Sequence, residues 1–323
     1  LGKNIFKRIE CYYILIILNI YVKYKSYLEE NGEYDFDDLI MEATKVVRNS
    51  SYTRSFKYII IDEYQDSSFI RFNLIKEIVE TNKAYFMAVG DDFQSIYKFS
   101  GSDIGLFINF NEYFKKGKVL KIQTTYRNSQ ELVDIAGDFI MQNKKQLRKE
   151  MRSNIHINKP IKIVYYEKKE EDFYKLCLYL KRNNSYNILV LGRNNNDVKG
   201  YMSKEVTFKE GIINLENDDT MKISYMTMHR SKGLECDDVV IINLRDDTFG
   251  FPSQVEADKI LNYIRKDTKK DFLEEERRLF YVGLTRAKRN IYLFTPKKKA
   301  SAFVIELLKN YKDKLEIINN LDK

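Results

Sequence analysis

Two adjacent carboxylates, Asp62 and Glu63, follow the apolar run from Tyr58 to Ile61 and form the chemically richest pattern in the chain. A bounded apolar run of this length predicts a short buried strand, so both carboxylates would leave its carboxyl end together. One carboxylate can then hold Mg²⁺ while its neighbour polarises an attacking water, as in nucleoside triphosphate hydrolysis. A lone Asp-Glu pair is more often a solvated strand end, but the whole string from Tyr58 to Asp66 favours the catalytic interpretation.

A second polar string follows the apolar run that begins at Tyr85. It contains Gln94, whose carboxamide could sense a terminal phosphate. Tyr97 and Phe99 flank Lys98, which is the mixture of rings and charge found where bases stack and phosphates are neutralised. Either ring considered alone would more often be an ordinary core residue.

Three further strings place charged or hydrogen-bonding side chains after apolar runs. They are Thr124 to Ser129, Tyr225 to Glu235 and Glu274 to Lys288. A Tyr-Arg pair is trivial by itself, and a lone His beside a Lys is usually a surface or structural residue. Part of the last string also fits helix stabilisation by charges four residues apart. The order of these strings along the chain, rather than any one of them alone, favours a functional interpretation.

The elements that must position these side chains are alternating strands and helices. The predicted strands are Tyr58 to Ile61, Tyr85 to Val89, Val119 to Ile122, Ile188 to Leu191, Ile223 to Met226, Val239 to Ile242 and Ile291 to Phe294. The predicted helices are Phe69 to Glu80, Ser129 to Met141 and Phe272 to Leu284. Continuous apolar runs suit strands buried on both faces of a parallel sheet. The alternation predicts an open α/β sheet, or two, with ligands bound outside the carboxyl ends of the strands.

In content and order, these strings resemble the motifs of the UvrD/Rep helicases of superfamily 1, over about residues 21 to 295. The stretch from Asp35 to Leu39 looks like the segment that leads into the Mg²⁺ motif of that family. The resemblance implies that Asp62 binds Mg²⁺ and that Glu63 is the catalytic base. It also implies that Gln94 couples the terminal phosphate to the DNA site.

The resemblance assigns roles to the aromatic and arginine side chains as well. It implies that Tyr97 and Phe99 contact nucleic acid, with Phe99 at the position of a base-stacking ring. Tyr126 would stack on adenine. Arg127 would act as an arginine finger on the transferring phosphoryl group, and Arg286 would reach the terminal phosphate from the far domain.

The string that ends at Glu235 would link the nucleotide and DNA sites in the same family. By resemblance, Thr227, His229 and Lys232 would bind nucleic acid. Gly233 would contribute to the nucleotide site, and Glu235 would be placed for the ribose. A strand with a purely structural role would not require this set of residues.

The resemblance implies an α/β fold of RecA-like parallel sheets flanked by helices, one sheet truncated and one complete. Residues 1–117 would be a partial first domain, with a remnant of an inserted helical subdomain at 1–34. Residues 118–323 would be the second domain, without a large accessory insertion. Besides the absent or reduced accessory insertion between Arg127 and His229, the chain departs from the family in two further ways. It contains no G-x-x-x-x-G-K-[ST] phosphate loop, and the string Ser100-Gly101-Ser102 stands where many relatives have Arg-Gly-Ala.

These features predict an ATP- and Mg²⁺-dependent DNA helicase or translocase that acts on single-stranded DNA and duplex junctions, in the 3′ to 5′ direction by resemblance. Without a phosphate loop, ATP turnover by this chain alone would be severely impaired, and an upstream segment would have to supply the loop. The alternative is a helicase-derived, non-catalytic DNA-binding or protein-interaction module. A nuclease would need a separate carboxylate and lysine constellation, for which the sequence offers no convincing candidate.

The composition agrees with such partners. A net charge of +8 and a pI near 9.0 suit a protein that meets a polyanion, although a solvated Lys-rich surface has the same composition. Three dispersed cysteines and two histidines favour neither disulfides nor zinc, and we expect a reducing, cytoplasmic compartment. The run from Cys11 to Val22 is too short for a membrane span, so we expect a buried helix and no membrane partner. Because the chain starts at Leu1 rather than Met, we expect either a piece of a longer polypeptide or a chain that begins after a removed segment.

Overall fold

The chain folds into two compact units. The computed structural model describes residues 2–49, 55–115, 117–255 and 269–322. Unit 1 takes its residues from 1–91, 97–115 and 256–271, and unit 2 takes its residues from 92–96, 116–255 and 272–323. The short segment 92–96 therefore belongs to the larger unit.

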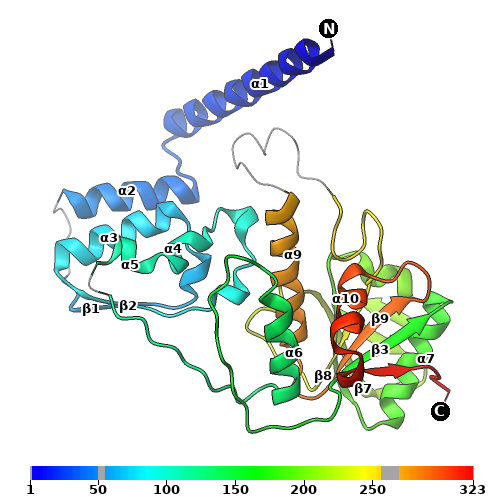
Figure 1. Ribbon diagram of the computed structural model, residues 1–323. Helices are drawn as coiled ribbons and strands as arrows, with labels where there is room; N and C mark the ends of the chain where they lie inside the picture. The colour runs from blue at the N-terminus through cyan, green and yellow to red at the C-terminus, as the bar shows by residue number, and fades with distance from the viewer. Residues whose placement is uncertain (1, 50–54, 116, 256–268, 323) are drawn as a thin grey trace. The chain divides into compact units, whose positions relative to one another are not determined.

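Unit 1 combines helices with a two-stranded parallel sheet (Figure 1). In chain order its elements are α1 (Gly2–Asn31), α2 (Phe36–Arg48), β1 (Tyr58–Ile61), the 3₁₀ turn η1 (Tyr64–Asp66), α3 (Phe69–Asn82), β2 (Tyr85–Ala88), the 3₁₀ turn η3 (Lys98–Ser100), α4 (Ile104–Ile108) and α5 (Phe110–Tyr113). Capping side chains set where two of the helices begin, because Asp35 and Ser68 accept hydrogen bonds from backbone amides in the first turns of α2 and α3.

One face of the unit 1 sheet packs on aromatic side chains. Ile61 and Phe86 pack against a core formed by Tyr64, Phe72 and Leu106. The rings of Tyr64 and Phe86 meet edge to face with their centroids 6.0 Å apart, an arrangement that aromatic pairs favour. Side chains from α3, α4 and α5 thus cover this side of β1 and β2.

The opposite face of the same sheet is open. Tyr58 stacks on Tyr85 with ring centroids 5.5 Å apart, and Ile60 lies opposite Met87 in the parallel register. All four side chains are exposed, Ile60 by 66%. The prediction that these strands are buried on both faces is therefore wrong for unit 1, because the described residues of this unit cover only one face.

The helix predicted over the run from Cys11 to Val22 is part of α1, but the prediction that it is buried is wrong. The side chains of this run are exposed. The contacts that join α1 to α2 involve its last turns, where Tyr24 donates to Asp35 over 3.1 Å and Lys25 donates to Asp38 over 2.6 Å. Among the described residues, none of the helices combines the length and apolarity that a membrane crossing requires.

Unit 2 is built on an eight-stranded, mostly parallel sheet (Figure 1). The strand order is β10 (Glu316–Ile318), β3 (Ile161–Tyr166), β9 (Ile291–Pro296), β8 (Asp238–Ile241), β4 (Asn187–Gly192), β7 (Asp218–Thr227), β6 (Ile212–Leu215) and β5 (Val206–Lys209). The strands from β10 to β7 pair in parallel, whereas β6 and β5 pair antiparallel. Its helices and 3₁₀ turns are η2 (Asp92–Gln94), α6 (Gln130–Ile140), α7 (Lys169–Arg182), η4 (Asp197–Tyr201), α9 (Lys269–Leu284), α10 (Ala302–Tyr311) and η5 (Lys312–Lys314).

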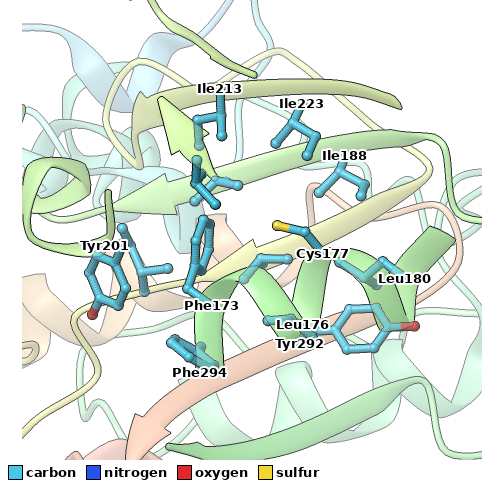
Figure 2. Close-up of a cluster of buried hydrophobic side chains, with 14 of the residues drawn as sticks. Phe173, Leu176, Cys177, Leu180, Ile188, Tyr201, Ile213, Ile223, Tyr292 and Phe294 are labelled. Carbon is cyan, nitrogen blue, oxygen red and sulfur yellow. The ribbon is translucent and has the colours of Figure 1, made fainter. Parts of the chain in front are cut away.

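Helix α7 covers one face of the unit 2 sheet. Its residues Phe173 and Leu176 pack against strand residues that include Ile188, Ile223 and Phe294 (Figure 2). All five side chains are buried. The apolar face of α7 therefore supplies one half of the core.

The other face of the sheet carries α9, which packs with α6 and α10. Gly283 of α9 lies so close to the sheet that a β-carbon there would stand 3.2 Å from the Ile241 side chain. Phe139 of α6, Phe280 of α9 and Phe303 of α10 form a ring cluster with centroids 5.2 to 5.4 Å apart. Helices on both faces bury all of β8 and every residue of β4 after Asn187, as a covered parallel sheet requires.

The predicted helices and most of the predicted strands are confirmed. The helices are α3, α6 and α9, and the strands are β1, β2, β4, β7, β8 and β9. The prediction of a strand from Val119 to Ile122 is wrong, because this segment has no regular structure and Leu120 is 89% exposed. Its side chains suit a strand, but that preference takes effect only against a pleated surface on which they can pack. The elements additional to the predicted ones include the strands β3, β5, β6 and β10 and the helices α2, α4, α5, α7 and α10.

The core of unit 2 predicts unequal effects of one substitution at two sites. Ile188→Ala removes a side chain that is 1% exposed and should lower the free energy of unfolding by about 2–5 kcal/mol. Ile305→Ala, at a position of α10 that is 54% exposed, should change it by less than about 0.5 kcal/mol. Urea denaturation followed by circular dichroism measures both. Equal losses would contradict the placement of Ile188 in the core.

Candidate functional site

The paired carboxylates of unit 1 stand at the carboxyl end of β1, and both are exposed. The backbone N–H of Glu63 donates to Asp62 Oδ1 over 2.8 Å. Glu63 itself has φ 52° and ψ 39°, in the left-handed region. Residues other than glycine rarely adopt this conformation, and it is enriched at functional sites where the surrounding structure enforces it.

Two aromatic side chains of unit 1 flank Lys98 in and beside the turn η3. The rings of Tyr97 and Phe99 meet edge to face with centroids 6.0 Å apart. Phe99 is exposed and Tyr97 is half-buried. An exposed aromatic ring that packs against a second ring offers a surface on which a base can stack.

Gln94 belongs to unit 2 and lies at the junction of three distant strings. Its backbone oxygen accepts a hydrogen bond from Lys232 Nζ over 3.1 Å. Its side-chain Oε1 accepts one from Arg286 Nη2 over 3.3 Å. Residues from three strings widely separated in the sequence are thus joined through one glutamine.

Buried polar contacts hold the segment 92–96 within unit 2. The Asp92 carboxylate is fully buried, pairs with Lys149 and accepts a hydrogen bond from Gln146 over 2.9 Å. Arg278 donates to the backbone oxygen of Ser95 over 2.7 Å and to Gln146 Oε1 over 3.2 Å. Charges removed from water require such partners, so this network fixes the backbone that carries Gln94.

Arg286 is buried, and its guanidinium is oriented by backbone oxygens. Nε donates to Val282 over 2.9 Å and Nη1 donates to Leu234 over 3.2 Å. The planar guanidinium fixes the directions of its N–H groups. These bonds therefore hold Nη2 toward Gln94.

Arg127 meets the string that ends at Glu235. Arg127 Nε donates to Glu235 Oε2 over 2.8 Å, and Lys288 Nζ lies 2.6 Å from Glu235 Oε1. The Lys288 ammonium and the Arg127 guanidinium lower the pKa of Glu235, while Glu235 raises the pKa of Lys288. Partly exposed ion pairs of this kind are weak, so a phosphate could compete with Glu235 for Arg127. Tyr126, the residue before Arg127, is exposed.

Strands β4 and β7 deliver further polar side chains to one edge of the sheet. Gly192 lies opposite Thr227 in the parallel register, so Arg193 and His229 follow neighbouring strand ends. Burial, reinforced by the positive charge of Arg193, lowers the pKa of His229 from 6.5 to about 4. The imidazole is therefore neutral near pH 7 and can stack or form hydrogen bonds, but it is not a cation. Gly233 adopts φ 81°, the left-handed conformation that glycine accommodates without strain.

The structure brings some of the sequence-predicted site residues together. Gln94, Lys232 and Arg286 form one network, and Arg127 pairs with Glu235. Sequence reasoning assigned no role to the residues that support the predicted site residues, namely Gln65 in unit 1 and Asp92, Gln146, Lys149 and Arg278 in unit 2. All of these are buried except Lys149, which is half-buried. The available signal was that Gln65, Asp92 and Arg278 lie inside the strings that carry the predicted chemistry.

A resident metal cluster is not a feature of the described residues. Among them, no group of three or more His, Cys, Asp or Glu side chains could hold a metal ion. Mg²⁺ commonly uses one or two carboxylates and completes its coordination with water and phosphate oxygens. The exposed Asp62 carboxylate fits a donor set of that kind.

Two family models match the chain. The model of the UvrD/REP helicase N-terminal domain matches residues 10–115. The model of the UvrD-like helicase C-terminal domain matches residues 202–298. Both matches include strings that carry the predicted chemistry, since the first contains Asp62 and Glu63 and the second contains Glu235 and Arg286.

Curated relatives agree with these models. The chain is 32% identical to DNA helicase IV of Escherichia coli over 290 residues, which cover 89% of this chain and 40% of that protein. It is 29% identical to the ATP-dependent DNA helicase Rep of Buchnera aphidicola subsp. Acyrthosiphon pisum, over 92% of this chain and 46% of that protein. It is 31% identical to the ATP-dependent DNA helicase PcrA of Bacillus subtilis, over 48% of this chain and 21% of that protein. The chain thus spans less than half the length of each of these relatives.

The buried network around segment 92–96 predicts a large stability effect at Asp92. Asp92→Asn leaves the Lys149 ammonium without its carboxylate and should lower the free energy of unfolding of unit 2 by about 3–5 kcal/mol. The control is Glu167→Ala, which breaks an exposed pair with Lys297 and should leave the free energy nearly unchanged. Chemical denaturation of both variants measures the two free energies of unfolding. An Asp92→Asn variant as stable as the control would show that the network does not anchor the segment.

The neutral state of His229 predicts a pH dependence of stability. The unfolded chain takes up the proton near pH 6.5, but the folded chain takes it up only near pH 4. The stability contribution of the neutral ring is therefore complete above pH 6.5 and is lost as the pH falls toward 4. Between pH 8 and pH 5 the wild-type chain should lose about 2 kcal/mol more than His229→Gln. Parallel pH profiles of the unfolding free energy would rule out a buried neutral imidazole.

Proposed function

Because the chain belongs to the UvrD/Rep helicase family, we propose that it is part of an ATP-driven motor that moves 3′ to 5′ along single-stranded DNA and separates duplexes. Residues 1–117 would be a partial RecA-like domain and residues 118–323 the second one. These proposed domains differ from the two compact units, because segment 92–96 belongs to unit 2 and 256–271 belongs to unit 1. The observation that carries this proposal is the contact of Gln94 with Arg286 and Lys232, because it joins three motif strings in one polar network.

The carboxylates of unit 1 would supply the hydrolytic chemistry. Asp62 would hold Mg²⁺, which when bound would neutralise charge on the phosphates. Glu63 would accept a proton from the attacking water. The exposure of both side chains at the end of β1 supports these roles, since a nucleotide needs open access to them.

The arginines and aromatic side chains of unit 2 would bind the nucleotide. Tyr126 would stack on adenine, and Glu235 with Gly233 would approach the ribose. Arg127 would leave Glu235 for a phosphate oxygen, and Arg286 would act on the terminal phosphate from beside Gln94. Support comes from the weak, partly exposed pairing of Arg127 with Glu235 and from the fixed orientation of the Arg286 guanidinium.

Single-stranded DNA would be bound by side chains of two kinds. Tyr97 and Phe99 would stack on bases, and Lys232 would contribute positive charge. Thr227 and His229 would contact the DNA strand. His229 would do so as a neutral ring, because its pKa near 4 excludes a cationic role near neutral pH. The net charge of +8 favours binding to a polyanion.

The phosphate loop would come from a segment outside these 323 residues. The sequence contains no G-x-x-x-x-G-K-[ST] string, whose backbone amides and Lys would cradle the phosphates. The open apolar face of β1 and β2, lined by Tyr58, Ile60, Tyr85 and Met87, supports this proposal. Parallel strands normally have both faces covered, so a further segment that packs there would complete the domain.

Mg²⁺-dependent ATP hydrolysis, with and without single-stranded DNA, tests the proposal. We expect no DNA-stimulated turnover from this chain alone and clear turnover when it is joined to a segment that carries the phosphate loop. Glu63→Gln should then lower kcat by about 10²- to 10⁴-fold, because the general base is lost. Glu112→Gln, a matched change at an exposed site of α5, should leave kcat unchanged.

Two outcomes would overturn parts of this proposal. Turnover by the chain alone that disappears in Glu63→Gln would show that no external phosphate loop is needed. Salt-sensitive DNA binding without turnover or nucleotide dependence, even with the loop supplied, would favour the alternative of a non-catalytic DNA-binding module. The observation that favours a non-catalytic module is the absence of the phosphate-loop string from the sequence.

A further inference from the structure

Gln65 links the ends of both strands of the unit 1 sheet. Its side chain is fully buried in the turn η1. The amide nitrogen Nε2 donates to Glu63 Oε2 over 2.5 Å, and Oε1 accepts from the backbone N–H of Asp91 over 3.0 Å. One buried carboxamide therefore joins the carboxylate that follows β1 to the backbone that follows β2.

Glu63 has an unusual backbone conformation, next to a turn that is attached to the end of β2. Glu63 has φ 52°, a conformation that glutamate rarely adopts. The next residue, Tyr64, donates its backbone N–H to Val89 over 2.9 Å. The turn that follows Glu63 is thus attached to the end of β2 by the Tyr64–Val89 backbone bond and by the Gln65 side chain.

Gly90 provides the space that Gln65 occupies. A β-carbon at position 90 would stand 2.3 Å from Gln65 Oε1 and 2.8 Å from the Phe107 ring. Its backbone does not have a positive φ, so conformational freedom is not the requirement here. The glycine is needed because the carboxamide passes directly over the backbone.

We propose that Gln65 is a positioning residue that fixes the direction of the Glu63 carboxylate relative to the Asp91 backbone. A neutral amide can orient a carboxylate without neutralising it, whereas a Lys or Arg in the same place would form an ion pair and weaken a base. The Glu63 carboxylate would thus be held in a single orientation. We call the contacts of the Gln65 side chain with Glu63 and with the Asp91 backbone the clamp. The benefit of the clamp to catalysis rests on the general-base role proposed for Glu63, but the clamp itself does not depend on that role.

The clamp is tested by nuclear magnetic resonance on the full chain labelled with ¹⁵N-glutamine. The Gln65 side-chain amide signals are identified by their loss in Gln65→Glu. Glu63→Asn removes the carboxylate, and asparagine tolerates the left-handed backbone. We expect Glu63→Asn to speed solvent exchange of the Gln65 amide hydrogens by roughly ten-fold or more. Glu112→Ala, at an exposed site of the same unit, should leave that exchange unchanged, and equal exchange in all forms would overturn the clamp.

The catalytic benefit is tested by kinetics in the polypeptide that also carries the phosphate loop. Gln65→Glu keeps the size and the acceptor of the side chain but places a second carboxylate against Glu63. At pH 8, kcat should fall about ten-fold or more while KM for ATP stays within about two-fold.

Control variants separate positioning from folding and from the proposed function. Gln142→Glu makes the same change at an exposed glutamine and should alter neither kcat nor KM for ATP. If Gln65→Glu fails to fold, Gln65→Asn provides a neutral, shorter substitute that should lower kcat and leave KM for ATP within about two-fold. Unchanged kcat in folded Gln65 variants overturns the positioning role. An inactive wild-type polypeptide overturns the proposed turnover, while the amide exchange still decides the clamp.

Discussion

Parallel pairing of neighbouring strands is the constraint on which both candidate sites depend. In unit 1, the register of β1 with β2 brings Asp62 and Glu63 to the same sheet edge as Asp91, and Gln65 can bridge them only because both strands end there. In unit 2, the register of β4 with β7 has the same consequence, since Gly192 lies opposite Thr227. Polar side chains that follow the carboxyl ends of the strands can contact a ligand while the strands themselves remain buried.

In unit 2, buried charged side chains fix the segment that carries Gln94. Asp92 and Arg278 are almost wholly removed from water, and they are tolerable there because each has hydrogen-bonding or charged partners. These contacts explain why segment 92–96 belongs to unit 2. Gln94 therefore stands on a rigid backbone, and Arg286 reaches it from a guanidinium that backbone oxygens orient. Rigid support of this kind is what precise charge stabilisation in a reaction requires.

Sequence patterns predicted the elements better than their surroundings. Apolar runs identified β4 and β8 because both faces of these strands are buried, which makes the run continuous. The same criterion failed for Val119 to Ile122, which is exposed and irregular. Hydrophobicity shows that a segment needs a partner but not whether that partner is present. Gln65 received no role because its importance arises from a contact with Asp91, far along the chain.

We propose that the open face of β1 and β2 is the surface on which a phosphate-loop segment completes unit 1. Backbone hydrogen exchange, measured by mass spectrometry on the chain alone and joined to such a segment, tests this proposal directly. We expect peptides covering residues 58–61 and 85–88 to exchange far more slowly in the joined form, while peptides from β4 and β8 do not change. Equal exchange of β1 and β2 in both forms would contradict it.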